Sequence, residues 1–225
     1  MTDHQPGPTQ RPVDEHVPRW RSTRPVIAIS RQHGAGGELV ARRLAEGLEL
    51  ELFDREIIDR IAANAHRSAR VVRAVDERER KMLADCLAAL APDEYLSANA
   101  YREHLTQVVL GIGERGGAVI LGRGAHLILG PSRALCILVG APLALRVAEV
   151  ARAEGLSERA ARLRVAGVEA ERRAFILRHF HADPADLSVF DLAVNTGTLG
   201  IDGAVAAVRS TVERLQERRP AARAG

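Results

Sequence analysis

The sequence predicts one α/β domain built on a parallel sheet with helices on both faces, a three-layer fold. Five short apolar segments alternate with stretches of helical periodicity, which is the order expected for strands joined by crossover helices. The chain has 225 residues and 46% hydrophobic content, enough for one substantial core of this type. Its first apolar segment runs directly into a glycine-rich turn, and in such sheets ligands bind outside the carboxyl ends of the strands.

The first strand and its turn are the most informative stretch of the chain. A strand is expected over residues 26–30, which are mainly apolar and β-branched, and a helix over 36–48. Between them lie Gly34, Gly36 and Gly37. Backbone N–H groups exposed at such a turn, next to the positive end of a helix, form a ready phosphate site. The predicted phosphate- or nucleotide-binding residues are Ser30, His33, Gly34, Ala35, Gly36, Gly37 and Glu38.

The turn departs from the phosphate-loop pattern GxxxxGK[ST]. Where that pattern has lysine and then Ser or Thr, this chain has Gly37, Glu38 and Leu39, and its only lysine is the distant Lys81. Arg31 within the turn, or an arginine from elsewhere, could supply the missing charge, since guanidinium suits phosphate well. Glu38 either caps the helix in the anion's place or helps to hold Mg²⁺.

The next segment predicts an edge strand that ends in charged residues. Residues 49–54 alternate polar and apolar side chains, and a helix is expected over 55–65. Asp54 and Arg55 would then stand on the same rim as the glycine turn and contact the ligand. Alternatively, Asp54 only caps the helix and Arg55 is solvated.

A helical insertion is predicted over about 69–115. Apolar positions trace a helical stripe over 69–90, and Pro92 starts a further helix that runs to about residue 115. The insertion either covers the substrate side of the domain or packs against a second copy of the chain. The sequence leaves both alternatives open.

Two buried strands follow, over 118–121 and 134–139, both apolar as in the centre of a parallel sheet. The first of them runs into Gly122, Arg123 and Gly124. Glycines on either side of an arginine leave bare backbone, so that a phosphate can approach the guanidinium closely. The alternative is that the glycines serve the turn and Arg123 is solvated.

The carboxyl-terminal third combines an arginine-rich helix with a last strand and helix. A helix over 143–153 ends before a second helical stretch, which is either a solvated face or a mobile lid over about 155–182. The last strand is expected over 189–195 and the final amphipathic helix over 202–218. The arginines of the lid hypothesis are Arg162, Arg164, Arg172, Arg173 and Arg178.

Composition narrows the function classes. The formal net charge of +3 is too small to predict nucleic-acid binding, and no apolar run approaches the length of a membrane span. Cys86 and Cys136 lie in apolar patterns without metal-ligand spacing, which predicts reduced core residues, no metal site of their own and a cytoplasmic protein. The proline-rich residues 1–24 are expected to be a disordered leader, residues 25–218 the domain and residues 219–225 a loose tail.

Four blocks in a recognisable order carry a family resemblance: residues 28–38, 52–57, 119–124 and 190–196. Together they resemble the cytidylate kinase-like family, a branch of the P-loop nucleoside monophosphate kinases. The resemblance covers roughly residues 25–210. It implies a P-loop NTPase-like fold with a five-stranded parallel sheet in the order 2-3-1-4-5, a side that binds the nucleoside monophosphate, and a lid.

The resemblance also implies an activity and a set of roles. The activity is ATP-dependent phosphoryl transfer to CMP or dCMP, with Mg²⁺ accompanying ATP and nucleotides as the partners. Arg123 matches an arginine that contacts the acceptor nucleotide, and Asp54 and Arg55 would lie beside it. Arg31, Arg123 and Arg172 are the expected catalytic residues, and the other arginines of the lid close over the phosphates.

Two departures from the family pattern keep a second hypothesis open. Cytidylate kinases have lysine and a hydroxyl residue in the loop, and aspartate after the matching arginine, where this chain has Gly124. Removing a preorganised group that stabilises transition-state charge typically slows chemistry by about 10²–10³. The chain is therefore either an enzyme in which another arginine substitutes, or a weakly active nucleotide-binding module that regulates or binds a partner, with a homodimer through the insertion as one form.

Overall fold

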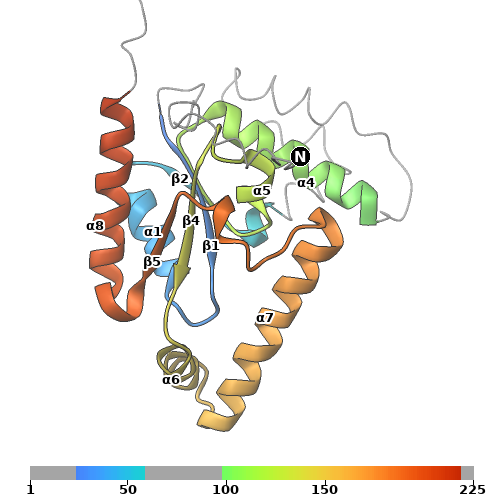
Figure 1. Cartoon of the computed structure of the whole chain (residues 1–225), viewed down its shortest axis with the longest axis vertical. Coiled ribbons are helices and arrows are strands. Elements are labelled where there is room, and N and C mark those ends of the chain that lie inside the picture. Colours follow the sequence, from blue (N-terminus) through green and yellow to red (C-terminus); the bar gives the residue numbers. More distant parts are fainter. Residues whose placement is uncertain (1–23, 59–97, 219–225) are drawn as a thin grey trace, which may run out of the picture.

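The computed structural model describes residues 24–58 and 98–218. Residues 1–23, 59–97 and 219–225 lie outside the described residues. They include most of the predicted leader, the end of the predicted helix 55–65, the predicted insertion up to residue 97 with Lys81 and Cys86, and the predicted tail. Within the part that is described, Figure 1 shows a central sheet with helices on both of its faces. This confirms the predicted three-layer α/β fold.

The described strands form a parallel sheet in the order β2-β3-β1-β4-β5, which confirms the predicted order. Ile27 of β1 pairs with Val119 of β3 on one side, and Ile29 pairs with Ile137 of β4 on the other. β1 is therefore central, and its carboxyl end meets those of β3 and β4 at one edge. The strands are β1 Val26–Arg31, β2 Glu51–Phe53, β3 Ala118–Leu121, β4 Leu135–Gly140 and β5 Leu192–Asn195.

The central strand is buried on both faces, as its unbroken apolar sequence predicts. Ile27 and Ile29 pack into a core with α1 and α8, whereas Val26 and Ala28 pack into a second core with α4 and α5. The four residues are at most 1% exposed. The flanking helices are α1 Gly37–Gly47, α8 Thr196–Glu217, α4 Ala98–Arg115 and α5 Ala125–Leu129.

A pair of helices stands beyond the carboxyl end of β4 (Figure 1). α6 spans Leu143–Glu154, and α7 spans Glu158–Phe180 as one continuous helix over most of the predicted lid. The Ser157 hydroxyl accepts a hydrogen bond from the Ala160 N–H at 3.3 Å, so α7 has the capped start that the sequence predicts. A small apolar cluster joins the two helices, made of Val147, Val150, Ala161 and Val165.

One short helix was not predicted, and the last strand and the last helix begin at other residues than predicted. The short helix α5 follows β3 directly and was not expected. The last strand begins at Leu192 because Leu187–Val189 form a 3-10 turn capped by Asp186. The last helix begins at Thr196 because the Asn195 side chain accepts a hydrogen bond from the Gly197 N–H, and a kink at Gly200 separates this first turn from the rest.

Cys136 is a buried core residue, as predicted. Burial, and then the nearby Asp191 carboxylate, raise the pKa of the Cys136 thiol to about 12, which keeps it protonated. Asp191 also accepts a hydrogen bond from the Cys136 N–H at 2.7 Å and donates its own N–H to the Cys136 carbonyl at 2.8 Å. These hydrogen bonds attach the residue just before β5 to β4. Over the residues that are described, no helix combines the length and apolarity needed to cross a membrane.

The stability of this core should fall in mild acid because of His126. His126 on α5 stacks on Phe190 with ring centroids 4.7 Å apart, and burial lowers its pKa to about 4. In the unfolded chain the imidazole takes up a proton near pH 6.5, before the folded protein does. The free energy of unfolding should therefore drop by up to about 3 kcal/mol between pH 6.5 and 4.

Urea denaturation of His126→Gln across this pH range would measure that contribution, because the variant lacks the titrating group and should show a shallower slope. His181→Asn is the matched control, since His181 is exposed and Asn tolerates its positive φ of 53°. An unchanged slope in His126→Gln would contradict the role given to His126.

Candidate functional site

The turn between β1 and α1 has the backbone shape of an anion site. Gly34 and Gly36 have φ values of +79° and +72°, in the left-handed region that favours glycine. Gly36 is the N-cap of α1 and no side chain caps the helix, so the N–H groups of its first turn are not bound by a cap. A Cβ atom at Gly34 would lie 2.6 Å from the Arg146 carbonyl oxygen, so only glycine fits against α6.

A cavity of about 260 Å³ opens between this turn and the α6–α7 pair. On one side it is lined by the turn and on the other by residues of α6 and by Arg172 of α7. Ser30 and Ala35 do not line it: Ser30 lies in β1, and Ala35 is buried with its carbonyl accepting a hydrogen bond from the Thr196 hydroxyl at 2.9 Å. The predicted loop residues that do line the cavity are His33, Gly34, Gly36, Gly37 and Glu38.

Arg31 lies beneath the loop and is largely buried, with its side chain 14% exposed. Its Nη2 is 3.5 Å from Glu38 Oε1, and its buried Nε has no hydrogen-bond partner. Burial lowers the pKa of Arg31; Glu38 opposes this shift, whereas the positive charges of Arg55 and Arg123 add to it. Arg31 is thus a largely buried cation beside other cations, and its Nε–H group is available to bind an anion.

The Arg31 side chain occupies the space where a lysine at position 37 would begin. A Cβ atom at Gly37 would lie 2.5 Å from Arg31 Cβ and 2.8 Å from Arg31 Cγ. In the GxxxxGK[ST] pattern the spacing puts the first glycine at position 31 and the lysine at position 37. This chain has the cation at the first of these positions and glycine at the second, so the two residue types are exchanged.

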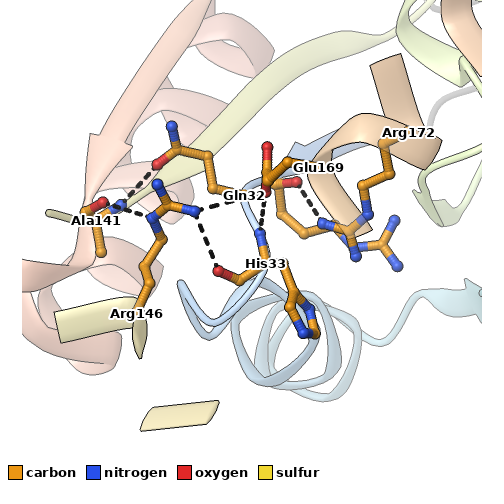
Figure 2. Close-up of polar contacts among 7 residues, drawn as sticks. Gln32, His33, Ala141, Arg146, Glu169 and Arg172 are labelled. Carbon is orange, nitrogen blue, oxygen red and sulfur yellow. Dashed lines mark hydrogen bonds and ion pairs between the residues drawn. The ribbon is translucent and has the colours of Figure 1, made fainter. Parts of the chain in front are cut away.

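Arg172 reaches the loop from α7. Its Nη1 donates a hydrogen bond to the Arg31 carbonyl at 2.9 Å (Figure 2). Burial, and then the charge of Arg31, lower the pKa of Arg172 to about 10. Of the arginines in the lid hypothesis, Arg172 is the one that the structure brings to the loop.

Of the remaining predicted lid arginines, Arg164 is close enough to the loop to lower the pKa of His33, and the others lie at exposed positions of α7. Arg162 Nη2 is 3.5 Å from Glu158 Oε1, and Arg164 Nε is 3.3 Å from Glu154 Oε2. Both side chains are more than half exposed, and Arg173 and Arg178 are exposed as well. Arg162, Arg173 and Arg178 lie on a solvated face of α7, whereas Arg164 pairs with Glu154 of the cavity lining.

Arg123 lies in the turn after β3 with a positive φ of 52°, and its guanidinium carbon is 5.0 Å from the centroid of the Phe175 ring. This cation–π contact ties the turn to α7. Gly124 follows with φ +68°, and a Cβ atom there would lie 2.4 Å from Cε2 of Phe180. Arg123 is thus held on the Phe175 ring, close enough to Arg31 to lower its pKa.

Asp54 and Glu38 are placed differently from each other. Asp54 Oδ1 accepts a hydrogen bond from the Ile57 N–H at 2.9 Å, which is the capping role that the sequence left open. Glu38 does not cap α1; it lies in the first turn, 73% exposed, where the helix dipole favours a carboxylate and where it pairs with Arg31. Arg55 is exposed but close enough to lower the pKa of both Arg31 and Arg172.

Two residues of this region were not predicted from the sequence. The Arg146 side chain is 11% exposed; its Nε donates to the Ala141 carbonyl at 3.0 Å and its Nη1 to the His33 carbonyl at 3.4 Å. Glu169 Oε1 accepts a hydrogen bond from the His33 N–H at 2.6 Å (Figure 2). In an arginine-rich chain nothing marks Arg146, and only the three-residue spacing from Arg172 could have drawn attention to Glu169.

Comparisons with known proteins agree with the arrangement of strands and loop. The model of the cytidylate kinase-like family matches residues 26–198. A cytidylate kinase of Methanopyrus kandleri is 28% identical over 202 residues, which cover 86% of this chain and 95% of that protein. A cytidylate kinase of Pyrococcus horikoshii is 32% identical over 102 residues, so the match spans 53% of that protein's length and 45% of this chain.

Among solved structures, an uncharacterized protein from Eubacterium ventriosum superposes with a TM-score of 0.65 at 20% identity. The superposition covers 85% of this chain and 99% of that protein. At this identity the likeness supports the fold alone.

Introducing lysine at Gly37 should destabilise the protein rather than restore a standard loop. In Gly37→Lys the new side chain would meet Arg31, which should lower the free energy of unfolding by about 1–3 kcal/mol. In an Arg31→Gly background the same substitution should be tolerated, because the space is free. Chemical denaturation of all four combinations would measure the coupling between the two positions.

Gly167→Lys is the matched control for this cycle. Gly167 lies inside α7 with nothing within 4 Å of its added Cβ, so lysine there should be neutral or slightly stabilising. A Gly37→Lys loss that is equally large with and without Arg31 would show that the two side chains do not share one space.

Proposed function

Since this chain belongs to the cytidylate kinase-like family, we propose that it transfers the γ-phosphoryl group of ATP to a nucleoside monophosphate. CMP or dCMP is the proposed acceptor, because the curated relatives that the chain matches are cytidylate kinases. The donor would bind at the loop between β1 and α1, and the acceptor on the side of Arg123. The protein would act in the cytoplasm, and its partners would be nucleotides.

The observation that carries this proposal is the gathering of Arg31, Arg55, Arg123 and Arg172 at the carboxyl ends of β1 and β3. Burial lowers the pKa of Arg31 and Arg172, and each is lowered further by neighbouring arginines. Arg31 and Arg172 are the two largely buried cations of this group, and buried like charges are unfavourable unless an anion lies between them. A polyphosphate supplies several oxygens of the opposite charge, and guanidinium groups bind such oxygens in well-defined geometry.

The proposed roles follow from where each group lies. The loop N–H groups and the amino end of α1 would hold the donor phosphates, and Arg31 would supply the charge that lysine supplies in the standard loop. Arg172 would bring a second cation from α7, and Arg123 would hold the acceptor phosphate. Catalysis would then consist of positioning and charge stabilisation, which is what phosphoryl transfer mainly needs.

Mg²⁺ would arrive with ATP and neutralise charge on its phosphates. Across residues 24–58 and 98–218 no group of three His, Cys, Asp or Glu side chains is arranged to hold a metal ion by itself. Protein sites for Mg²⁺ commonly use one or two carboxylates together with substrate phosphates. Glu38, the carboxylate of the loop that lines the cavity, is the residue that fits such a role.

The second candidate is a nucleotide-binding module with little or no turnover. Its support is the loop itself, which has Gly37 in place of lysine and Glu38 in place of the hydroxyl residue. Such a module would bind nucleotide in the same cavity and act through a partner. A second copy of this chain, docked through the insertion predicted over 69–115, is the form proposed from the sequence.

Purified protein with Mg²⁺, ATP and CMP should form CDP, measured as transfer of labelled phosphate. Arg31→Ala and Arg172→Ala should lower kcat by roughly 10²–10³, because each removes a charge that stabilises the transition state. Arg123→Ala should instead raise the KM of the acceptor by roughly tenfold or more, since a charge-assisted contact contributes about 1.5–3 kcal/mol. Arg42→Ala, an exposed arginine on α1, is the matched control.

The two candidate functions differ in two measurements. A rise in melting temperature with nucleotide, without any diphosphate product from the common monophosphates, would favour the binding module. If nucleotide causes no melting shift and no product forms, both candidates are ruled out. Wild-type kinetics in all three arginine variants would overturn the roles given to these arginines.

A further inference from the structure

Glu169 places a negative charge on the loop between β1 and α1. It lies on α7, and Figure 2 shows its carboxylate at the loop, between His33 and Arg146. The same oxygen, Oε1, accepts the His33 N–H at 2.6 Å and lies 3.6 Å from Arg146 Nη1. Hydrogen bonds to a carboxylate are shorter and stronger than those between neutral groups, and this one has the length of a strong bond.

Arg146 holds the Glu169 carboxylate in place through an ion pair. The Arg146 guanidinium is nearly buried and also donates to the Ala141 and His33 carbonyls, so it cannot move far without breaking the turn after β4. It therefore presents a fixed positive charge next to the His33 peptide. The carbonyl of His33 contacts Arg146 and its N–H contacts Glu169, so both polar groups of one loop residue are engaged.

The same face of α7 also carries the cation that favours phosphate. Residues three positions apart share a helix face, so Glu169 and Arg172 approach the loop together. Arg172 donates to the Arg31 carbonyl at 2.9 Å, whereas Glu169 accepts from the His33 N–H. A phosphate at the loop would attract the first side chain and repel the second. The two contacts of α7 with the loop therefore respond to an anion in opposite directions.

We propose that Glu169 is a built-in competitor of the donor phosphate: its carboxylate accepts the His33 N–H of the loop, and nucleotide binding displaces it. This inference rests on the proposed function, because it takes the loop to be the donor phosphate site. Displacement leaves Arg172 on the phosphates and frees the middle of α7 from the loop. Occupancy of the nucleotide site thereby controls how α7 sits on it, and empty protein binds nucleotide more weakly than the loop alone would.

The test compares phosphate affinity in two glutamate variants of the full chain. Binding of inorganic tripolyphosphate and of Mg·ATP is measured by calorimetry for wild type, Glu169→Gln and Glu171→Gln. Glu169→Gln keeps the size of the side chain and removes its charge, and should bind both ligands roughly tenfold more tightly. Glu171 is exposed on the same helix, so Glu171→Gln makes the same change in net charge and should stay within about twofold of wild type.

A second readout follows the contact itself without nucleotide. In ¹⁵N-labelled wild-type protein the His33 amide proton should resonate downfield and exchange slowly, because it is bonded to a carboxylate. In Glu169→Gln the resonance should move upfield and exchange faster, and tripolyphosphate should restore protection in both proteins. Glu171→Gln should leave this resonance where it is.

The outcomes separate this inference from the proposed function. If wild type binds Mg·ATP and Glu169→Gln binds it with the same or lower affinity, the competitor role is wrong while nucleotide binding stands. Failure of both proteins to bind either ligand would overturn the nucleotide function and the inference with it. An unchanged His33 resonance in Glu169→Gln would show that the contact does not exist in solution.

Discussion

Positive charge gathered at the carboxyl ends of β1 and β3 is the constraint on which the rest of the site depends. Arg31 and Arg123 are fixed there by the sheet, and Arg172 is added from α7. Contacts within the protein hold each of these cations: Arg123 lies on the Phe175 ring, Arg172 donates to the Arg31 carbonyl, and Arg31 pairs with Glu38. The groups are thus ordered before any anion arrives, which is what a preorganised anion site requires.

The layers of the fold supply this order. Because β1 is the central strand and is buried on both faces, the loop that follows it starts from a rigid position. α6 closes against the loop through Gly34, and α7 reaches over it from a small apolar cluster at one end and an aromatic group around Phe175 at the other. α7 is therefore attached at both ends, while its middle touches the loop only through polar side chains.

The sequence was sufficient to predict the sheet and the position of the loop, but not which side chains meet at the loop. Apolar segments bounded by glycine locate strands, and the ordered family blocks imply the strand order, because both are encoded within short stretches. Which lid arginine reaches the loop depends on the rotation of α7, and Arg172 differs from Arg173 only in that respect. Arg146 and Glu169 act through peptide groups distant in sequence, so no local pattern marks them.

The contact between Gly124 and Phe180 restricts which residues position 124 can accept. A side chain at position 124 would need a backbone with φ +68°, and its Cβ atom would lie 2.4 Å from Cε2 of Phe180, a ring that packs against the core. Such a side chain is thus out of reach by one substitution, and the ring would have to shrink first, at a loss of packing. The turn after β3 is therefore fixed in its glycine by the aromatic side chain that α7 brings to it, so the two segments can change only together.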